Sequence, residues 1–600
     1  MDTKVRERAR VALLTGNEAI ARGAYEAGVA VATGYPGTPS TEILEFLSTL
    51  PDVYTEWSTN EKVALDVAAG ASMGGVRALC TMKHVGLNVA SDTFLVATYT
   101  GVRGGLVVVS ADDPGMHSSQ NEQDNRWYAK FAAVPLLEPS DSQEAKTFTE
   151  LAFGLSEEFD TPVLLRTTTR ISHTRGVVQL GSRRAVPPRP FQRDPAKYVM
   201  MPLYARLRRP KVLERVRRLA EVAARPEFLR VELRDPSVGV VTAGVCYGLV
   251  REVLPEASVL KLGMSYPLPV EAVREFASRV RRLLVVEELE PFLEEALRAA
   301  GLPVEGKAFF PQQGELTPEL VRQGFVKAGI LPEEPATPSP SLPTAPRPPV
   351  LCAGCPHTGP FVALRRLGAV ACGDIGCYTL GALEPLRAMD SCLAMGSSIG
   401  MATGLALAGT APGPVVAVIG DSTFLHAGLP ALVDAVYKQA NITVLILDNG
   451  TTAMTGGQPH PSTGISIRGD PAPRVDLASL CKAMGVEFVR VVDPYDLGAT
   501  FVALEEAVRY PGVSVVITNR PCVEAPVKVR DEPFRVVPER CTACQLCMDL
   551  GCPAIVWTTE TYEGRPKVTI RVDACTGCTV CAQVCPADAI VRVGAGQGRE

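Results

Sequence analysis

The sequence contains no apolar run that approaches the roughly 18 to 20 residues of a membrane-spanning helix. Its first ten residues, MDTKVRERAR, are charged, and no apolar signal-peptide core follows them. Both absences argue against a membrane or secreted protein. Seventeen cysteines in 600 residues also do not suggest a secreted disulfide scaffold. We therefore expect a cytoplasmic protein in a reducing compartment, with no membrane partner.

The sequence also lacks a strong excess of one charge and lacks a dinucleotide-binding fingerprint. Its formal net charge of −5 argues against a nucleic-acid-binding surface. The segment 206–234 is arginine-rich, but glutamates are interspersed, so we expect a solvated amphipathic helix there. The segment Tyr35-Pro-Gly-Thr-Pro lacks the spacing of GxGxxG, so NAD is not indicated. Nucleic acid is therefore not an expected partner, and we see no nucleotide or flavin fingerprint.

Eight cysteines in the last tenth of the chain form two similar runs, each closed by proline. In such runs three close cysteines bind one iron–sulfur cube, and the distant fourth cysteine ligates the other cube. Structural zinc favours two separated pairs of ligands, and disulfides do not call for two near-identical runs. We therefore predict two [4Fe–4S] clusters, with the first run bulging slightly at its extra residue. The predicted ligand sets are Cys541, Cys544, Cys547 and Cys585 for one cluster, and Cys552, Cys575, Cys578 and Cys581 for the other.

The rest of the chain alternates short β-rich runs with helical stretches, which is typical of parallel α/β sheets. Six hundred residues exceed one hydrophobic core, so several domains are expected. In the first part we expect a strand over 105–111 and a helix over 61–73. A later part has its clearest buried strands at 414–419 and 442–447. The proline-dense segment 331–349 cannot form a helix or a central strand, and it predicts a semi-rigid linker.

Polar residues follow both of these later strands. Gly420-Asp421-Ser422 comes after the first, and Asp448-Asn449-Gly450-Thr451 after the second. Open α/β sheets bind ligands at the carboxyl ends of their strands. Carboxylate and amide oxygens suit Mg²⁺ that is bound partly by substrate phosphates. Upstream, MGSSIG at 395–400 opens a predicted helix, whose N–H groups suit a diphosphate, although such turns also serve only close packing. The candidate diphosphate residues in this turn are Gly396 and Ser397.

The pattern GDS, followed about 26 residues later by DN, resembles the signature of thiamine-diphosphate enzymes, GDG…NN. That resemblance implies that Asp421, the side chain of Asn449 and the carbonyl of Thr451 hold Mg²⁺. Ser422 replaces a glycine of the signature and Asp448 an asparagine, but Asp448 is not an expected metal ligand. Beside two iron–sulfur clusters, thiamine is the favoured interpretation over an ordinary pair of strand-to-helix turns.

Thiamine chemistry needs a carboxylate against N1′ of the aminopyrimidine, and this group comes from a separate domain. In the first part of the chain Glu61 follows Asn60 and opens the helix predicted over 61–73. On spacing alone, favourable interaction with the helix dipole is the simpler role for Glu61. Glu56 lies near enough in sequence to be an alternative.

Long stretches of the chain resemble the 2-oxoacid:ferredoxin oxidoreductases, and within them the large (alpha) subunit of the indolepyruvate-specific enzymes. The matching stretches are GYPGTPSTEI, NEKVALDVAAGAS, LCAGCPH, GDIGCYTLG, GDSTFLHAGLPAL, DNGTTAMTGGQPHP and the cysteine runs. The resemblance implies a multidomain α/β fold in this order: a pyrimidine-binding thiamine domain (1–190), a transketolase C-terminal-like domain (191–330), the linker (331–349), a diphosphate- and magnesium-binding thiamine domain (350–530) and a small α+β two-cluster ferredoxin domain (531–600).

The resemblance also implies an activity and a set of site residues. Glu61 becomes the expected activating glutamate, and Thr38, Lys83 and His84 are expected near the reacting centre. Without the resemblance, His84 and His460 would more often be structural histidines. The implied reaction is oxidative decarboxylation of an aryl 2-oxoacid such as indolepyruvate, which yields an arylacetyl-CoA and CO₂ and reduces ferredoxin. The expected partners are a small beta subunit, ferredoxin, coenzyme A and the 2-oxoacid.

Two alternatives stay open at this point. One is an oxidoreductase for another 2-oxoacid, such as phenylpyruvate or an aliphatic one, since motifs do not report pocket shape. The other is a ferredoxin-like electron-transfer subunit with a vestigial thiamine fold, although the presence of Glu61, Asp421 and Asn449 argues against it.

A third cluster is predicted within the diphosphate domain. Its four cysteines have the spacing and order that relatives in the superfamily place around a cluster beside thiamine, whereas single cysteines are often only buried small hydrophobes. The predicted ligands of this possible [4Fe–4S] cluster are Cys352, Cys355, Cys377 and Cys522. The cysteines expected only to pack are Cys80, Cys246, Cys372, Cys392 and Cys481.

Overall fold

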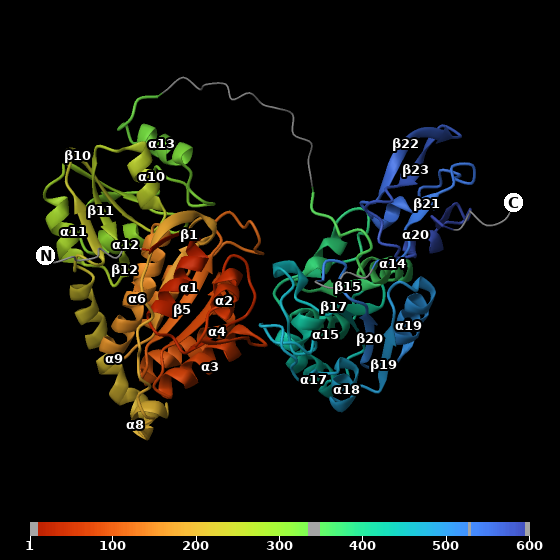
Figure 1. The fold of residues 1–600 in the computed structure, drawn as a ribbon, viewed down its shortest axis with the longest axis horizontal. Coiled ribbons are helices and arrows are strands. Elements are labelled where there is room, and N and C mark those ends of the chain that lie inside the picture. The colour runs from red at the N-terminus through yellow and green to blue at the C-terminus, as the bar shows by residue number, and fades with distance from the viewer. Residues whose placement is uncertain (1–9, 334–347, 526–529, 595–600) are drawn as a thin grey trace, which may run out of the picture. The chain divides into compact units, whose positions relative to one another are not determined.

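The computed structural model describes residues 10–333, 348–525 and 530–594 (Figure 1). The chain divides into two compact units, Met1–Ser339 and Pro340–Glu600. The division falls inside the predicted linker, of which residues 334–347 lie outside the described part. No helix among the described residues is long and apolar enough to cross a membrane.

The first unit contains a seven-stranded sheet in the order β12-β6-β7-β5-β4-β2-β3. All its neighbouring strands are parallel except β12, which is antiparallel to β6. Small and branched apolar residues fill the core between this sheet and its helices. The strands are β2 (Val31–Gly34), β3 (Tyr54–Trp57), β4 (Ala78–Lys83), β5 (Leu106–Asp112), β6 (Leu136–Leu137), β7 (Val163–Thr168) and β12 (Met264–Tyr266), and the main helices are α1 (Gly16–Glu26), α2 (Thr41–Ser48), α3 (Glu61–Met73), α4 (His84–Thr100), α5 (Arg126–Ala132) and α6 (Ser142–Phe159).

A second sheet of the same unit has the order β14-β13-β10-β11-β9. Its strand β11 is followed closely by β12, which joins the first sheet, so the chain itself ties the two sheets together. The strands are β9 (Leu229–Glu232), β10 (Asp235–Ala243), β11 (Ala257–Leu262), β13 (Arg282–Val286) and β14 (Val304–Glu305), and the helices are α10 (Cys246–Val253), α11 (Val270–Ala277), α12 (Phe292–Ala299) and α13 (Pro318–Lys327). A separate two-stranded antiparallel sheet pairs β1 (Arg10–Thr15) with β8 (Arg175–Leu180), which are far apart in the sequence.

The arginine-rich segment differs from its prediction. The helix α9 covers Pro202–Val222 and ends well before residue 234, because the chain then enters β9. Two of its arginines are buried rather than solvated. Arg208 donates to the carbonyl of Tyr99 (2.6 Å) and Arg215 to that of Thr98 (2.8 Å). These are carbonyls of the last turn of α4, where the helix dipole favours positive charge.

The second unit is built on a six-stranded parallel sheet in the order β16-β15-β17-β18-β20-β19. The predicted strands at 414–419 and 442–447 are present one residue later, as β17 (Val415–Gly420) and β18 (Thr443–Asp448), both fully buried. The other strands are β15 (Val370–Gly373), β16 (Ser391–Cys392), β19 (Phe488–Val492) and β20 (Ser514–Asn519), and the helices are α14 (Thr358–Leu367), α15 (Ser398–Ala408), α16 (Asp421–Thr423), α17 (Leu429–Tyr437), α18 (Leu477–Ala483) and α19 (Leu497–Arg509).

The C-terminal part of this unit is a small α+β module. Two antiparallel pairs, β21 (Phe534–Val536) with β24 (Ile590–Arg592) and β22 (Ile555–Tyr562) with β23 (Arg565–Ile570), accompany the short helix α20 (Val580–Gln583). The module packs on the parallel-sheet part, since Gln583 Oε1 accepts from the backbone N of Leu497 (3.0 Å) and its Nε2 donates to the carbonyl of Tyr495 (2.6 Å). The predicted fold class, multidomain α/β with a small α+β ferredoxin-type module, is confirmed.

Gly324 of α13 tests the packing of this helix on the core beside the second sheet. A Cβ at Gly324 would lie 2.2 Å from an atom of the Phe310 ring, so Gly324→Ala overpacks the core and should destabilise it by about 1–3 kcal/mol. The matched control is Gly248→Ala in α10, where a Cβ would meet nothing within 4 Å and alanine favours the helix by about 1 kcal/mol.

Because a chain of several domains does not unfold in one two-state step, the measurement is hydrogen–deuterium exchange of α13 and α10 peptides. Exchange in α13 should accelerate in Gly324→Ala, and exchange in α10 should slow or stay unchanged in Gly248→Ala. Equal protection of α13 in Gly324→Ala and the parent protein would contradict this packing.

Candidate active site and cysteine clusters

The first candidate site lies at the carboxyl ends of strands in the first unit. The strand β4 runs directly into α4, so that Lys83 is the N-cap of this helix and His84 its first residue. The neighbouring helix α3 begins at Glu61, and the Asn60 side chain caps it by accepting from the backbone N of Val63 (2.9 Å). Local capping and strand direction therefore bring two helix starts to one edge of the sheet.

Glu61 is buried where α3 and α4 approach each other, with 5% of its surface exposed. A Cβ at Gly86, in the first turn of α4, would lie 2.7 Å from Glu61 Oε1. Glycine is therefore required at this position for the carboxylate to lie against the helix. The alternative carboxylate, Glu56, lies on β3 opposite Thr33 and accepts from the backbone N of Trp57 (2.9 Å).

Lys83 lies among the other candidate residues of this edge. Its Nζ donates to the carbonyl of Ser118 (2.9 Å), and Ser118 Oγ donates to the carbonyl of Thr38 (3.3 Å). Burial lowers the pKa of Lys83 to about 8, against the opposing effect of the carboxylates of Asp113 and Glu61. The ammonium of Lys83 therefore interacts electrostatically with the carboxylates of both Asp113 and Glu61.

His84 completes the set. Its Nε2 lies 3.3 Å from the carbonyl oxygen of Asn121. Burial, followed by the charge of Lys83, lowers the pKa of His84 to about 4, so the imidazole is neutral at pH 7. The structure thus gathers Thr38, Glu61, Lys83 and His84 at one edge of the sheet, and their place at a reacting centre stays a prediction.

The loop 113–125, which connects β5 to α5, contributes groups that the sequence prediction missed. Asp113 accepts from the backbone N of Ser118 (2.8 Å), from Ser119 Oγ (2.7 Å) and from Thr169 Oγ1 (2.7 Å). The same loop supplies the carbonyls that face Lys83 and His84. Its sequence after the strand, HSSQNEQDN, is a run of polar residues at a ligand-binding strand end, and that was the available signal.

The second candidate site lies at the ends of β17 and β18 in the second unit. The carboxylate of Asp421 accepts from the backbone N atoms of Ser422 and Gly450 (2.8 Å each) and lies 3.2 Å from His460 Nε2. Burial opposes ionisation of Asp421, but the hydrogen bond from His460 keeps the pKa of Asp421 below its usual range. Burial and the Asp421 charge raise the pKa of Asp448 to about 6.

Asn449 is held beside Asp421 by groups from three segments. Its Oδ1 accepts from the backbone N of Thr451 (3.2 Å), and its carbonyl accepts from the backbone N of Cys522 (2.9 Å). Its Nδ2 lies 3.4 Å from Nε2 of His357, whose buried ring packs edge-on against Tyr378. His357 was missed although it is part of LCAGCPH. Asp421, Asn449 and Thr451 are buried and offer hard oxygens, so the residues present fit Mg²⁺.

The predicted diphosphate turn is already engaged by a carboxylate. The backbone N of Gly396 donates to Asp374 Oδ1 (2.5 Å), and that of Ser398 donates to Asp374 Oδ2 (3.2 Å). These N–H groups are therefore not free, contrary to the expectation, and α15 starts at Ser398, inside the turn predicted over 395–400. The diphosphate role of Gly396, Ser397, Gly420 and Ser422 stays a prediction. Burial raises the pKa of Asp374 to about 6, against its hydrogen bonds.

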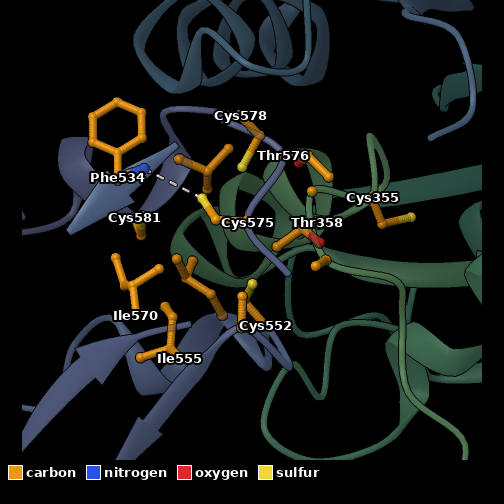
Figure 2. Close-up of a pocket in the computed structure, with 15 residues that line it drawn as sticks. Cys355, Thr358, Phe534, Cys552, Ile555, Ile570, Cys575, Thr576, Cys578 and Cys581 are labelled. Carbon is orange, nitrogen blue, oxygen red and sulfur yellow. Dashed lines mark hydrogen bonds between the residues drawn. The ribbon is translucent and has the colours of Figure 1, made fainter. Parts of the chain in front are cut away.

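The eight C-terminal cysteines gather into the two predicted groups of four. One group lines a cavity between the β21–β24 pair and the first cysteine loop, and burial together with Cys544, Cys585 and Cys541 raises the pKa of Cys547 to about 11. The other group lines a second cavity, shown in Figure 2 with Cys552, Cys575, Cys578 and Cys581 around it. The extra residue of the first run is accommodated by a short helical turn at Met548–Leu550 and by Gly551, whose φ is +64°.

The third predicted group is also brought together. Burial, followed by the neighbouring Cys522 and Cys352, raises the pKa of Cys377 to about 11. Burial also raises the pKa of Cys355, which has Cys352, Cys377 and Cys522 as neighbours. Cys355 lines the same cavity as Cys552, so the third group adjoins the second (Figure 2).

No three His, Cys, Asp or Glu side chains in the described ranges converge tightly enough to hold a single metal ion. Of the cysteines predicted only to pack, four are buried and Cys392 is partly buried.

Comparisons with known proteins agree with this arrangement. A family model described as "Pyruvate flavodoxin/ferredoxin oxidoreductase, thiamine diP-bdg" matches residues 22–221, one described as "Thiamine pyrophosphate enzyme, C-terminal TPP binding domain" matches 374–518, and a "4Fe-4S dicluster domain" matches 534–586. These matches define a thiamine-diphosphate-dependent oxidoreductase that carries iron–sulfur clusters.

Curated relatives narrow the class to one family. The chain is 44% identical to the indolepyruvate oxidoreductase subunit IorA of Archaeoglobus fulgidus, over 96% of this chain and 97% of that one. It is 45% identical to the IorA protein of Methanothermobacter thermautotrophicus (97% of each chain) and 41% identical to that of Pyrococcus horikoshii (98% and 97%). The chain belongs to the IorA family of indolepyruvate oxidoreductase subunits, enzymes of thiamine-dependent 2-oxoacid oxidation.

Among solved structures, the 2-oxoglutarate:ferredoxin oxidoreductase from Magnetococcus marinus overlaps 54% of this chain and 66% of its own, with a TM-score of 0.45 and 18% identity.

The lowered pKa of Lys83 gives a direct prediction for this site. Acylation of Lys83, followed by peptide mass spectrometry across a pH series, should reach half its maximum near pH 8, whereas an ordinary lysine does so near about 10.4. Asp113→Asn should shift this midpoint to lower pH, because it removes a carboxylate that favours the charged ammonium. The control is Asp549→Asn on the C-terminal module, which should leave the midpoint unchanged. An upward shift in Asp113→Asn would show that the charges do not interact as described.

Proposed function

We propose that this chain catalyses oxidative decarboxylation of aryl 2-oxoacids such as indolepyruvate, with formation of an arylacetyl-CoA and CO₂ and reduction of ferredoxin. We further propose that it acts in the cytoplasm as a heteromer with a small beta subunit. The observation that carries the proposal is near-full-length similarity to proteins named indolepyruvate oxidoreductase subunit, in a chain that also has the buried carboxylate and oxygen-ligand sites described above. The five-part domain division predicted from the sequence is part of this proposal.

The residues of the first unit have distinct tasks in the proposed reaction. Thiamine diphosphate, when bound, supplies the nucleophilic carbon and electron sink on which decarboxylation depends. Glu61 exchanges a proton with N1′ of the aminopyrimidine, a task that suits a buried carboxylate at a helix start. The positive charge of Lys83 suits the carboxylate of a 2-oxoacid. The neutral imidazole of His84 can transfer a proton without carrying a fixed charge.

The residues of the second unit hold the charged end of the cofactor. Asp421, Asn449 and the carbonyl of Thr451 are the proposed Mg²⁺ ligands, since they offer buried hard oxygens at neighbouring strand ends. Gly420 and Ser422 border this site, and Gly396 and Ser397 are the proposed contacts of the diphosphate, which must take the place of the Asp374 carboxylate at the Gly396 N–H. His357 and the Cys522 backbone hold Asn449 in place.

The three cysteine groups form the proposed electron path. Cys355, of the group nearest the strand ends, lines the same cavity as Cys552. Cys581, of that next group, has Cys547 of the last group as an electrostatic neighbour. This contiguity supports transfer from the proximal cluster through the middle one to the outer one, and then to ferredoxin.

The function is tested by anaerobic turnover with several 2-oxoacids, coenzyme A and a one-electron dye, after co-expression with the small subunit. Glu61→Gln should lower dye reduction by about 100-fold or more, as loss of a general acid–base group does, and should leave the iron content unchanged. Lost iron in Glu61→Gln would mean that Glu61 is structural. A preference for aliphatic 2-oxoacids would overturn the aryl specificity, and rapid turnover by the isolated chain would overturn the need for the beta subunit.

The third cluster is tested by iron analysis of reconstituted protein. Three cubane clusters require about twelve iron atoms per chain, whereas the two C-terminal clusters alone require about eight. Cys522→Ser should reduce the content by about four, and the control Cys481→Ala, at a buried cysteine outside the three groups, should not. About eight atoms in the parent protein would contradict the third cluster.

A further inference from the structure

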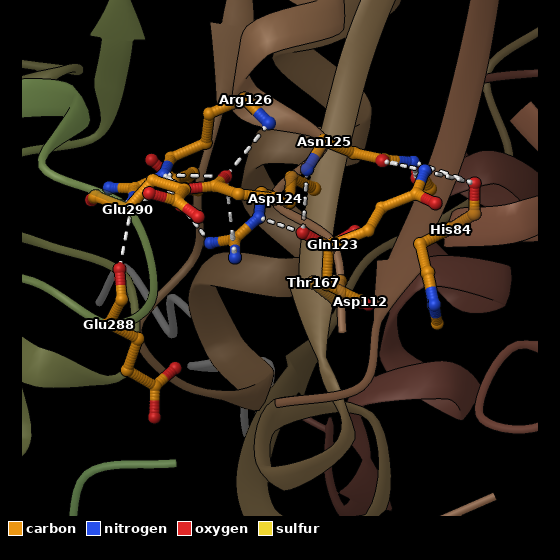
Figure 3. A network of polar contacts seen from close by, with 12 residues as sticks. His84, Asp112, Gln123, Asp124, Asn125, Arg126, Thr167, Glu288 and Glu290 are labelled. Atoms are coloured by element: carbon orange, nitrogen blue, oxygen red, sulfur yellow. Dashed lines mark hydrogen bonds and ion pairs between the residues drawn. The ribbon is translucent and has the colours of Figure 1, made fainter. Parts of the chain in front are cut away.

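The segment Gln123–Arg126 connects the candidate catalytic edge of the first unit to its second sheet (Figure 3). It forms the end of the loop after β5 and the start of α5. Its side chains alternate between two sides: Gln123 and Asn125 contact the first turn of α4, and Asp124 and Arg126 lie toward the strand end of β13. These contacts give the segment a role that neither the sequence nor the proposed reaction assigns.

Gln123 and Asn125 fix the first residue of α4. Asn125 is fully buried, and its Nδ2 donates to the carbonyl of His84 (3.0 Å) and to Ser110 Oγ (2.8 Å). Gln123 Nε2 lies 3.3 Å from the same carbonyl and 2.7 Å from Asn125 Oδ1. Two amide side chains that support each other therefore hold one carbonyl. That carbonyl belongs to the residue directly after Lys83, so it fixes the point where β4 becomes α4.

Arg126 is fixed to the second sheet, and Asp124 pairs with it. Arg126 is 2% exposed, and its Nη1 donates to Glu287 Oε2 (2.7 Å) at the end of β13. Its Nη2 donates to the carbonyls of Glu288 (2.8 Å) and Glu290 (3.0 Å). The carboxylate of Asp124 balances the same guanidinium (2.6 Å). A buried charge with this many partners has no alternative position of similar energy, because each unmade bond would leave a desolvated group.

A second contact, made by Glu122, joins the loop to the segment between β14 of the second sheet and α13. Glu122 accepts from the backbone N of Gly314, 3.0 Å from its Oε1, and from the backbone N of Gly115 (2.7 Å). Gly314 lies between β14 and α13. The end of the loop is therefore bonded to the part of the chain that forms the second sheet at two residues, Glu122 and Arg126.

We propose that Gln123 and Asn125 are positioning residues through which the second sheet, by way of Arg126, sets the place of Lys83 and His84. The catalytic importance of that place rests on the function proposed above. The contacts themselves do not, and the test is chosen so that the two can fail separately. The second sheet then helps to position the candidate catalytic residues, although it contributes none of them itself.

The first test removes the donor nearest to solvent. Gln123→Met keeps the length of the side chain but cannot donate to the His84 carbonyl. We expect faster hydrogen–deuterium exchange in a peptide that covers 84–90. We also expect the half-labelling pH of Lys83 to rise by about half a unit or more, because water reaches the amine. Burial of the amine and the carboxylates of Asp113 and Glu61 set this midpoint, whereas the neighbouring His84 imidazole is neutral in this pH range. The control is Gln120→Met in the same exposed loop, which should change neither quantity.

The second test acts from the far end of the connection. Glu287→Gln removes the charge that Arg126 Nη1 meets, while its amide oxygen can still accept a hydrogen bond. If the second sheet sets the place of α4, exchange at 84–90 rises and the Lys83 midpoint moves as in Gln123→Met. Changes confined to β13 and α12 would overturn the proposal. So would an unaltered α4 turn in Gln123→Met, a variant at a partly exposed site that should fold.

Turnover gives a third, separate quantity. With the small subunit present, Gln123→Met should lower kcat for the 2-oxoacid by about tenfold, as loss of alignment does, with the iron content unchanged. Exchange and labelling do not require turnover. An inactive parent protein would therefore count against the proposed function, and unchanged exchange and labelling would count against the positioning role.

Discussion

The buried ion pairs between the two sheets of the first unit are the constraint on which its candidate active site depends. Arg126 and Arg166 lie in the protein interior with four carboxylates around them (Asp112, Asp124, Glu138 and Glu287), and Arg166 bonds both Asp112 and Glu138 (2.7 and 2.6 Å). A charged side chain is stable in the interior only when its oppositely charged partners are held in hydrogen-bonding geometry. Removal of one partner destabilises the folded state by about 3–5 kcal/mol. The network therefore fixes how the end of β5 meets the second sheet. The loop that faces Lys83 and His84 begins and ends within it.

The second unit follows a different principle. Its candidate ligands follow two buried parallel strands, so the sheet register itself places Asp421 and Asn449 side by side. The third cysteine group attaches to the same strand ends, because Cys522 follows β20 and its backbone N bonds the carbonyl of Asn449. The candidate oxygen ligand Asn449 and the candidate sulfur ligand Cys522 are thus bonded to each other at neighbouring strand ends, so a shift of β20 would move both.

The parts of the site that follow from local chemistry were predictable from the sequence. The start of α3 at Glu61, the polar ends of β17 and β18, and the grouping of the cysteines all depend on spacing, capping and strand direction. The contacts that the sequence missed join residues far apart in the chain. Examples are Arg126 with Glu287, Asp374 with the turn at Gly396, and His357 with Asn449. The burial of Arg208 and Arg215 has the same origin, because only the folded chain brings the open carbonyls of α4 beside α9.

The crossed grouping of the C-terminal cysteines has a consequence for the biosynthesis of the protein. In the proposed pairing, Cys585 completes the site that Cys541 begins, and Cys552 belongs to the site of the later run. Synthesis runs from the N-terminal side, so these residues leave the ribosome after the parallel-sheet domains have had time to fold. In this pairing, neither cluster can be closed on a nascent chain that ends before Cys575, and the one that includes Cys585 must wait for that residue. Iron could therefore complete both sites only after the parallel-sheet domains had been made, and a chain that stopped before Cys575 would carry thiols that no complete cluster binds.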